Sequence, residues 1–206
     1  MSEISPSRKL ATEQRRGSIL QAARAVFARQ GYANTVVEDI ATQAGIAKGT
    51  VYLYFPSKEQ IYLAALLDEA RQLDADSRAA MNSASTWRDK LGAYMRVRLD
   101  YFEAHQDFLR IYMTEFRGMC MQGKPLSGEF IHLVQEGEAQ LAQIFAAASA
   151  RGEIRPVDPE LAAQTVSDVT RGLLERQLRK WGRPTGPADL EFALDILFRS
   201  LQNSPQ

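Results

Sequence analysis

The amino-acid sequence predicts an all-α protein of about nine helices, in which an N-terminal three-helix unit precedes a larger helical part. Apolar residues recur at spacings of three and four along almost the whole chain, which is the period of an amphipathic helix. Capping residues, glycines and prolines stand where helices of ordinary length would begin or end. No segment carries a convincing strand signal, so no sheet is predicted.

The first helix is predicted to follow a frayed segment, residues 1–12, and to end at Gly31. Glycine readily takes the left-handed conformation of the residue after a helix, which is why Gly31 marks the end. The apolar stripe of this helix consists of Ile19, Ala22, Ala23, Val26 and Phe27. These side chains share one face and would be buried against neighbouring helices.

Two short helices come next. The segment Thr35–Glu38 has the spacing of a capping box, so the second helix is predicted to begin there and to run to about Ala44. Gly45 closes it. The third helix is predicted over residues 48–54, and Pro56 stops it because the residue before a proline disfavours the helical conformation.

Six further helices complete the prediction. They are expected at about residues 57–81, 87–105, 108–116, 130–150, 159–181 and 190–201. Ser57 is the predicted cap of the first of these, and Asp158 with Pro159 provides a cap and a first-turn proline for the fifth. Residues 118–128 are predicted to form a loop, and residues 203–206 a frayed end.

Composition excludes several classes of protein. The 206 residues are 45% hydrophobic and 24% charged, which is ordinary for a folded globular chain of one or two domains. No run approaches the roughly 18 apolar residues of a membrane helix, and the N-terminus lacks the apolar core of a signal peptide. With Cys120 as the single cysteine, no internal disulfide can form, and a cytoplasmic location is the simpler expectation.

Catalytic and metal-binding chemistry has no readable motif. His105, His132 and Cys120 lack the spacing of a metal cage, and no nucleophile arrangement or glycine-rich phosphate loop is present. We therefore expect no catalytic residue, no metal and no cofactor. The net charge is zero, but the first 60 residues hold eight basic and five acidic side chains. That mild basic bias could be a chance fluctuation or the footprint of a nucleic-acid partner.

Residues 37–55 have the form of a helix-turn-helix. Ile40 and Val51 are expected to face inward, together with small Ala41 and Ile46, and Gly45 permits the turn. The outward side of the second helix is left with Lys48, Gly49, Thr50, Tyr52 and Tyr54. The alternative is a plain packing pair, in which the tyrosines are partly buried and the lysine is solvated.

Segments 35–41 and 44–59 resemble the DNA-binding signature of the TetR family of transcriptional regulators. The similarity extends upstream through Ala22-Ala23, Phe27 and Gly31-Tyr32, and covers about the first third of the chain. Ala47 stands where many members have serine, which removes one hydroxyl contact or cap at the start of the second helix. The resemblance implies DNA-binding roles for Val37, Lys48, Gly49, Thr50, Tyr52, Tyr54 and Lys58.

In DNA-binding helix-turn-helix proteins, the start of the second helix reaches base edges in the major groove. Lys48 would donate to guanine, Gly49 would allow close backbone approach, and the tyrosines and Lys58 would contact the backbone. Val37 would lie near the DNA backbone. Arg8 and Lys9 on the N-terminal arm could lie along DNA, but a solvated tail is the favoured expectation. The predicted domains are residues 13–58 for DNA binding and residues 59–202 for effector binding and dimerisation.

The resemblance also implies that the larger part binds a ligand and dimerises. The dimer interface is predicted at Val169, Leu173, Leu174, Leu178, Trp181, Leu194, Leu197, Phe198 and Leu201, unless these faces serve only the protomer core. An apolar effector pocket is predicted at Tyr94, Arg98, Tyr101, Phe108, Tyr112, Phe116 and Phe130, where a plain core is the alternative. Residues 112–117 and 152–159 are similar to acyl-CoA-responsive repressors of the family, which favours an acyl-type effector.

The sequence thus predicts a dimeric, ligand-responsive repressor that binds palindromic operator DNA and is released by a small apolar effector. A helical enzyme with an unrecognised pocket and a protein-interaction module are the alternatives. Turnover of a substrate would favour the enzyme, and DNA-free partner binding that is insensitive to salt would favour the interaction module.

Overall fold

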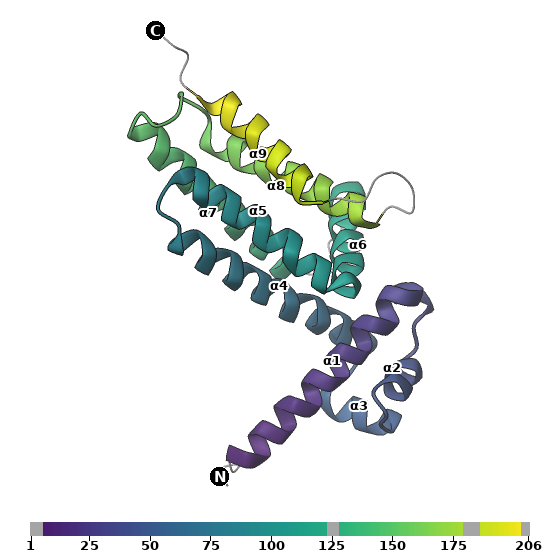
Figure 1. Cartoon of the computed structure of the whole chain (residues 1–206). Coiled ribbons are helices and arrows are strands. Elements are labelled where there is room, and N and C mark those ends of the chain that lie inside the picture. The colour runs from purple at the N-terminus through teal and green to yellow at the C-terminus, as the bar shows by residue number, and fades with distance from the viewer. Residues whose placement is uncertain (1–5, 123–127, 179–185, 203–206) are drawn as a thin grey trace. The chain divides into compact units, whose positions relative to one another are not determined.

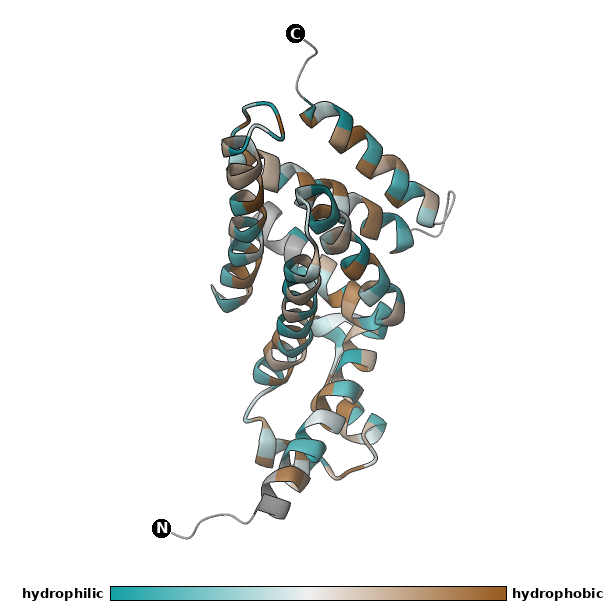
Figure 2. Ribbon diagram, turned by 60° about the vertical axis from the view of Figure 1, so that its left-hand side comes forward, coloured by the Kyte–Doolittle hydropathy of each residue, from teal (hydrophilic) through white to brown (hydrophobic). Residues whose placement is uncertain are grey.

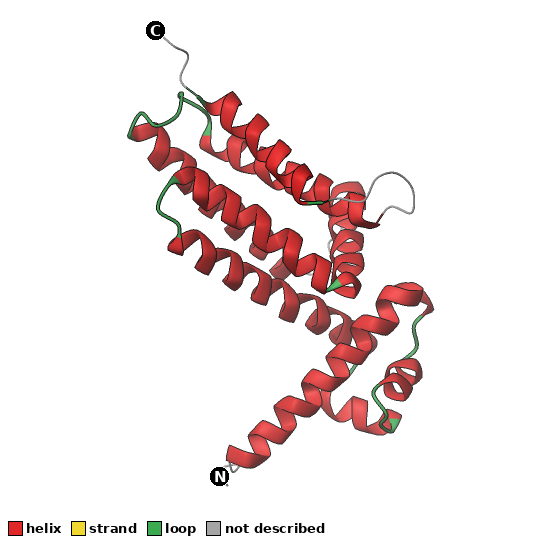
Figure 3. Ribbon diagram, viewed as in Figure 1, coloured by secondary structure: helices red, strands yellow, loops and turns green. Residues whose placement is uncertain are grey.

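The computed structural model describes residues 6–122, 128–178 and 186–202. Within those ranges the chain forms nine helices and no strand (Figures 1 and 3). Their bounds are α1 (Pro6–Asn34), α2 (Val37–Gln43), α3 (Lys48–Tyr54), α4 (Lys58–Ser83), α5 (Trp87–Ala104), α6 (Gln106–Gln122), α7 (Gly128–Ala150), α8 (Pro159–Leu178) and α9 (Pro187–Leu201). The predicted all-α fold is confirmed.

The chain divides into two compact units. The first comprises Met1–Glu69 with Asp107–Leu126, and the second comprises Ala70–Gln106 with Ser127–Gln206. Helix α4 contributes its first part to one unit and the remainder to the other. The first unit thus contains helix α6 and the first part of α4 in addition to the N-terminal helices. The predicted boundary between the DNA-binding and effector-binding domains falls earlier in α4, after residue 58.

In the first unit, α2 packs against both α1 and α3. The whole predicted stripe of α1, from Ile19 to Phe27, is buried. Gly31 has a φ of 77°, which ends the regular part of α1 as the sequence predicted. Ile40 of α2 and Val51 of α3 are both fully buried, while Ile46 is only half-buried.

In the second unit, α8 packs against α5, α7 and α9, and α5 also contacts α7 and α9. The hydropathy colouring of Figure 2 shows apolar and polar residues interleaved along these helices, as expected for amphipathic helices around a shared core. The fully buried side chains of this core include Leu91, Met95, Phe102, Phe130, Leu141 and Phe145. No helix of the described residues combines the length and apolarity needed to cross a membrane.

Several predicted boundaries are wrong. Helix α1 already begins at Pro6, so residues 6–12 are helical and not frayed. Helix α6 runs to Gln122, through the first part of the predicted loop. Helix α9 begins at Pro187, earlier than predicted. Its cap is Gly186, whose N–H donates to Asp189 Oδ2 at 2.8 Å. The Asp158 cap of α8 is confirmed, since its carboxylate accepts from the N–H of Glu160 at 3.0 Å.

The capping box of α2 is also displaced by one residue. The cap is Val36, whose N–H donates to Asp39 Oδ2 at 3.2 Å. The Thr35 hydroxyl instead donates back to the carbonyl of Gly31 at 2.7 Å. Thr35 is therefore occupied in closing the end of α1, and Asp39 takes the part predicted for Glu38.

Candidate nucleic-acid interface

The turn between α2 and α3 has the hydrogen bonds of a Schellman motif. The N–H of Ile46 donates to the carbonyl of Ala41 at 3.0 Å, and that of Gly45 donates to Thr42 at 3.1 Å. Gly45 has a φ of 65°, which glycine adopts at little cost. This turn fixes the direction in which α3 leaves α2, with Val51 of α3 in the core of the unit.

Because Val51 points inward, the opposite face of α3 is exposed. Gly49 lies on it, and Tyr52 has an exposed fraction of 45%. Lys48 is exposed at the N-terminal end of the helix, three residues before Val51. Thr50 and Tyr54 are half-buried. The structure therefore brings five of the seven predicted DNA-binding residues onto one short helix and leaves three of them exposed.

Sequence reasoning missed Leu53. Its exposed fraction of 83% is the highest among the exposed large hydrophobic residues of the described chain. Helical spacing would have found it, since Leu53 is four residues after Gly49 and so shares its face.

Lys48 forms an ion pair that spans the motif. Its Nζ lies 3.2 Å from Oε2 of Glu38 on α2, and both side chains are about half exposed or more. Exposed pairs of this kind add little stability. The pair instead holds the lysine at the start of α3 beside a carboxylate with which any incoming anion or base must compete.

Lys58 is engaged within the protein. Its Nζ donates to the carbonyls of Tyr32 at 2.8 Å and Thr35 at 2.9 Å, and it lies 4.3 Å from the centre of the Tyr32 ring. The ammonium thus satisfies carbonyls at the end of α1, where the helix dipole is negative. Lys58 is a structural tie between α1 and α4, a role that the sequence did not indicate, and two of its three donors are unavailable to phosphate.

The predicted contact at Val37 is restricted in a similar way. Its side chain is buried, with an exposed fraction of 6%, so only its main-chain N–H at the start of α2 could face a phosphate. Ala47, at the start of α3, makes no side-chain capping bond, as expected from the alanine.

A buried polar pair lies deeper in the first unit. The Tyr62 hydroxyl of α4 donates to Glu115 Oε1 of α6 at 2.7 Å. The Tyr62 ring packs edge-on against Phe27, 4.9 Å away, and against Tyr32, 5.0 Å away. A continuous set of contacts therefore runs from α6 through Tyr62 to Tyr32, the residue that Lys58 covers.

The pair is shielded from water, and this perturbs both groups. Burial raises the pKa of the Glu115 carboxyl above its ordinary value, and the hydrogen bond from Tyr62 opposes that rise only in part. Burial, followed by the bond to Glu115, also raises the pKa of the Tyr62 hydroxyl. In the folded protein the carboxyl therefore retains its proton to higher pH than in the unfolded chain.

This arrangement predicts a pH-dependent stability. Because the folded pKa of Glu115 exceeds the unfolded one, the free energy of unfolding should fall as pH rises from the ordinary value of 4.5 through the raised pKa, and then level off. Glu115→Gln should remove that fall. The free energy of unfolding of the variant, relative to that of the wild type, should therefore increase with pH. Urea denaturation between pH 4.5 and 8 measures the difference. Exposed Glu13→Gln on α1 is the control, and parallel curves for wild type and Glu115→Gln would refute the assignment.

The predicted effector residues are divided between the two units. Phe108 and Tyr112 of α6 are buried in the first unit. Tyr94 and Phe130 are buried in the second unit, where the Arg98 guanidinium carbon lies 4.5 Å from the Tyr94 ring centre. Tyr101 stacks on His105 at 4.2 Å between ring centres. The side chain of Phe116 falls outside the described residues. A shared pocket of these residues stays a prediction.

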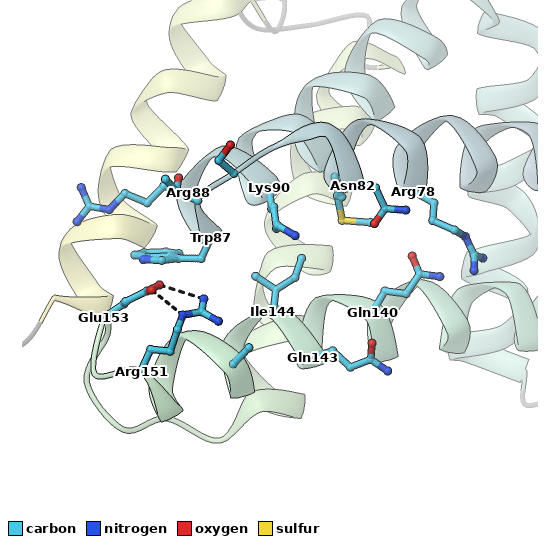
Figure 4. A pocket seen from close by; sticks show the side chains of 14 residues that line it. Arg78, Asn82, Trp87, Arg88, Lys90, Gln140, Gln143, Ile144, Arg151 and Glu153 are labelled. Carbon is cyan, nitrogen blue, oxygen red and sulfur yellow. Dashed lines mark hydrogen bonds and ion pairs between the residues drawn. The ribbon is translucent and has the colours of Figure 1, made fainter.

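A cavity of about 800 Å³ opens in the second unit among α4, α5 and α7 (Figure 4). Arg78, Lys90 and Arg151 line it together with Gln140 and other polar side chains. The carboxylate among the lining residues, Glu153, is bound by Arg151 at 2.6 and 3.2 Å. None of the predicted effector residues lines this cavity, and its polar, cationic wall does not suit a purely apolar ligand.

The predicted dimer residues are mostly core residues of the protomer. Five of them are buried within the second unit: Leu173, Leu174, Leu194, Leu197 and Leu201. Val169, Leu178 and Phe198 are half-buried, and Trp181 lies outside the described residues. These five leucines pack in the core of their own protomer, and the dimer interface stays a prediction. The exposed apolar residues of α9 are instead Phe192, at 67%, and Ile196, at 52%.

Two family models match this chain. The model for bacterial regulatory proteins of the tetR family matches residues 19–65, which include α2 and α3. The model for the C-terminal domain of AefR-like transcriptional repressors matches residues 100–189.

Curated relatives and solved structures that resemble this chain are also transcriptional regulators. The chain is 28% identical over 177 residues to the HTH-type transcriptional repressor KstR2 of Mycobacterium tuberculosis, a match that covers 84% of each chain. It is 32% identical over 112 residues to the transcriptional activator FasR of Mycolicibacterium smegmatis, covering 52% of this chain and 51% of FasR. The solved structure of KstR2 superposes with a TM-score of 0.73 at 26% identity over 92% of this chain and 96% of the other. FadR of Bacillus subtilis, solved with stearoyl-CoA, also has a TM-score of 0.73, over 92% and 98% of the two chains, and at 22% identity shows the shared fold.

Proposed function

Because the chain belongs to the TetR family and is a transcriptional regulator rather than an enzyme, we propose that it is a dimeric repressor of palindromic operator DNA. A small apolar effector of the acyl type would release it. The observation that carries this proposal is the exposed surface of α3, where Lys48, Gly49 and Tyr52 are accessible while Val51 is buried. KstR2, which matches across most of both chains, is named a repressor, and this supports repression rather than activation of transcription.

In this proposal α3 enters the major groove and reads base edges. Lys48 donates to the O6 and N7 acceptors of guanine, and Gly49 lets the backbone approach closely. The Tyr52 and Tyr54 hydroxyls and the Val37 N–H contact phosphates, which fixes the register of the helix. Thr50, half-buried at the start of α3, offers a hydroxyl to a neighbouring base or phosphate.

The Glu38 carboxylate should oppose DNA binding. It holds the Lys48 ammonium at 3.2 Å and places a negative charge beside the proposed path of the phosphates. Glu38→Gln should free the lysine and tighten duplex binding by several-fold, on the order of 1 kcal/mol. Fluorescence anisotropy at fixed salt measures it. The double variant Glu38→Gln/Lys48→Ala should lose most of the gain. An affinity that is unchanged or weaker in Glu38→Gln would count against contact through Lys48.

Salt dependence tests the DNA-binding function itself. If Lys48 and the α3 surface bind phosphates, the logarithm of the association constant for duplex DNA should fall linearly with the logarithm of salt concentration. Titrations of a labelled duplex from 50 to 200 mM KCl should show a loss of more than about tenfold. Absence of duplex binding at the lowest salt would contradict the proposal.

Two copies are needed to read a palindrome, and α9 offers the surface for a second copy. Phe192 and Ile196 are four residues apart, so they form one exposed apolar stripe along α9. Half-buried Val169 and Leu178 of α8, the helix that packs against α9, are further candidates for this surface. Isologous contact of these stripes around a twofold axis would bury both and set the separation of the two α3 helices.

Effector release is proposed to act through α4. This helix belongs to both compact units and follows α3 through Phe55, Pro56 and Ser57. A ligand that displaces its distal part would shift Lys58 and Tyr62, which hold the end of α1 and Glu115 of α6. The ligand must bind the free and DNA-bound states unequally for this to work.

A ligand titration tests this mechanism. Palmitoyl-CoA should bind the free protein and lower its affinity for duplex DNA, whereas coenzyme A without the acyl chain should not. Equal palmitoyl-CoA affinities for the free protein and for the DNA complex would exclude the mechanism, because such a ligand shifts no equilibrium.

A further inference from the structure

Leu53 is an apolar side chain in a place where the fold does not need one. It lies on α3 with an exposed fraction of 83%, so the protomer gives it almost no cover. Single exposed apolar residues are common and carry no argument by themselves. The position of this one is informative, because it falls on the face of the helix that the proposed function places in the major groove.

The orientation of Leu53 follows from the helix that carries it. Val51, two residues earlier, is fully buried and fixes which side of α3 faces the core. Gly49 is one turn before Leu53 on the same side, and no atom lies within 4 Å of where a Cβ at Gly49 would stand. The surface of α3 from Gly49 to the Leu53 side chain is therefore open to solvent. A duplex that approaches Gly49 closely would also meet Leu53.

The chemistry of the side chain limits what it could recognise. Leucine has no hydrogen-bond donor or acceptor, so it cannot read the polar edge of a base or hold a phosphate. In the major groove the apolar feature of a base pair is the C5-methyl group of thymine. Contact between the two would remove both from water, which is favourable.

We propose that Leu53 is a specificity-determining residue that reads the methyl group of one thymine in each half-site. This inference rests on the proposed DNA-binding function and deepens it. Lys48 near the start of α3 would read a guanine, and Leu53, five residues later, would select an A·T pair at a different position of the same half-site.

Replacing thymine by uracil tests the proposal without changing any hydrogen bond of the duplex. In a duplex that the wild-type protein prefers, each thymine is replaced in turn by deoxyuridine, which lacks only the methyl group. The wild type should lose about fourfold in affinity at one thymine per half-site, the value for one buried methyl group. Leu53→Ala should bind the original duplex more weakly and show no loss at that position. Leu53→Met, which keeps an apolar contact, should retain the loss.

Two results would overturn the inference while leaving the proposed function intact. One is duplex binding by the wild type with no loss at any deoxyuridine. The other is the same loss in Leu53→Ala as in the wild type. Leu161→Ala, which changes an exposed leucine of α8, is the matched control and should keep the wild-type pattern. If the wild type binds no duplex, the proposed function fails first, so the two failures are distinguishable.

Discussion

Replacing Phe192 and Ile196 together by glutamate is expected to convert the protein from a dimer to a monomer and to weaken binding to a palindromic duplex by about a thousandfold or more. Both side chains are more than half exposed on α9, so the protomer should fold without them. In the dimer, four apolar side chains would be replaced by four carboxylates facing one another across the twofold axis. Burying unpaired like charges costs far more than the lost apolar contact.

Analytical ultracentrifugation gives the mass, and anisotropy with a palindromic duplex gives the affinity. Ala79→Glu with Ala146→Glu adds the same two charges at exposed positions of α4 and α7 and should leave both measurements unchanged. A Phe192→Glu/Ile196→Glu protein that stays dimeric would show that α9 is not the interface.

Substitutions at Gly49 should change stability and DNA affinity in opposite directions. Its conformation is ordinary for a helix, and a Cβ there would meet no atom within 4 Å. Gly49→Ala should therefore stabilise α3 by about 1 kcal/mol and raise the melting temperature by about 2–4 °C. The added carbon would separate the α3 backbone from the DNA, and Gly49→Leu should lower duplex affinity by about a hundredfold through the loss of neighbouring base contacts.

Thermal unfolding and duplex titration of the same samples separate the two effects. Gly17 on α1 is also helical, and a Cβ there would meet no atom within 4 Å, so Gly17→Ala should reproduce the stabilisation without the loss of affinity. If Gly49→Leu binds duplex as tightly as the wild type, the backbone of α3 does not approach DNA.

Much of the fold was predictable because its signals are local. Helical period and caps lie within a few residues of one another, and glycine at 31 and 45 has the positive φ that the turns require. The helix-turn-helix is such a local motif, and its inward and outward residues alternate as predicted at Ile40, Val51, Lys48 and Gly49. The displaced capping box shows the limit. Glu38 and Asp39 could each be the carboxylate of a capping box, paired with Thr35 or with Val36. Because the Thr35 hydroxyl donates to Gly31, the box forms between Val36 and Asp39.

The hydrogen bonds that the sequence did not indicate depend on residues far apart in the chain. The bonds from Lys58 to Tyr32 and Thr35 span more than 20 positions, and the pair of Tyr62 with Glu115 spans 53. An apolar stripe also reveals which face of a helix is buried, but not whether the same chain or a second copy covers it. Leu194 and Leu197 therefore looked like interface residues although their own protomer covers them, whereas Phe192 and Ile196 remain uncovered.

Selection of bound sequences from random duplex DNA tests the central claim most directly, because it needs no knowledge of the operator. A pair of α3 helices related by a twofold axis should enrich a palindromic consensus, with half-sites about 34–36 Å apart or a multiple of that distance. Loss of the consensus in Gly49→Leu would assign it to α3. No enrichment, or a single asymmetric site bound by one protomer, would contradict the account.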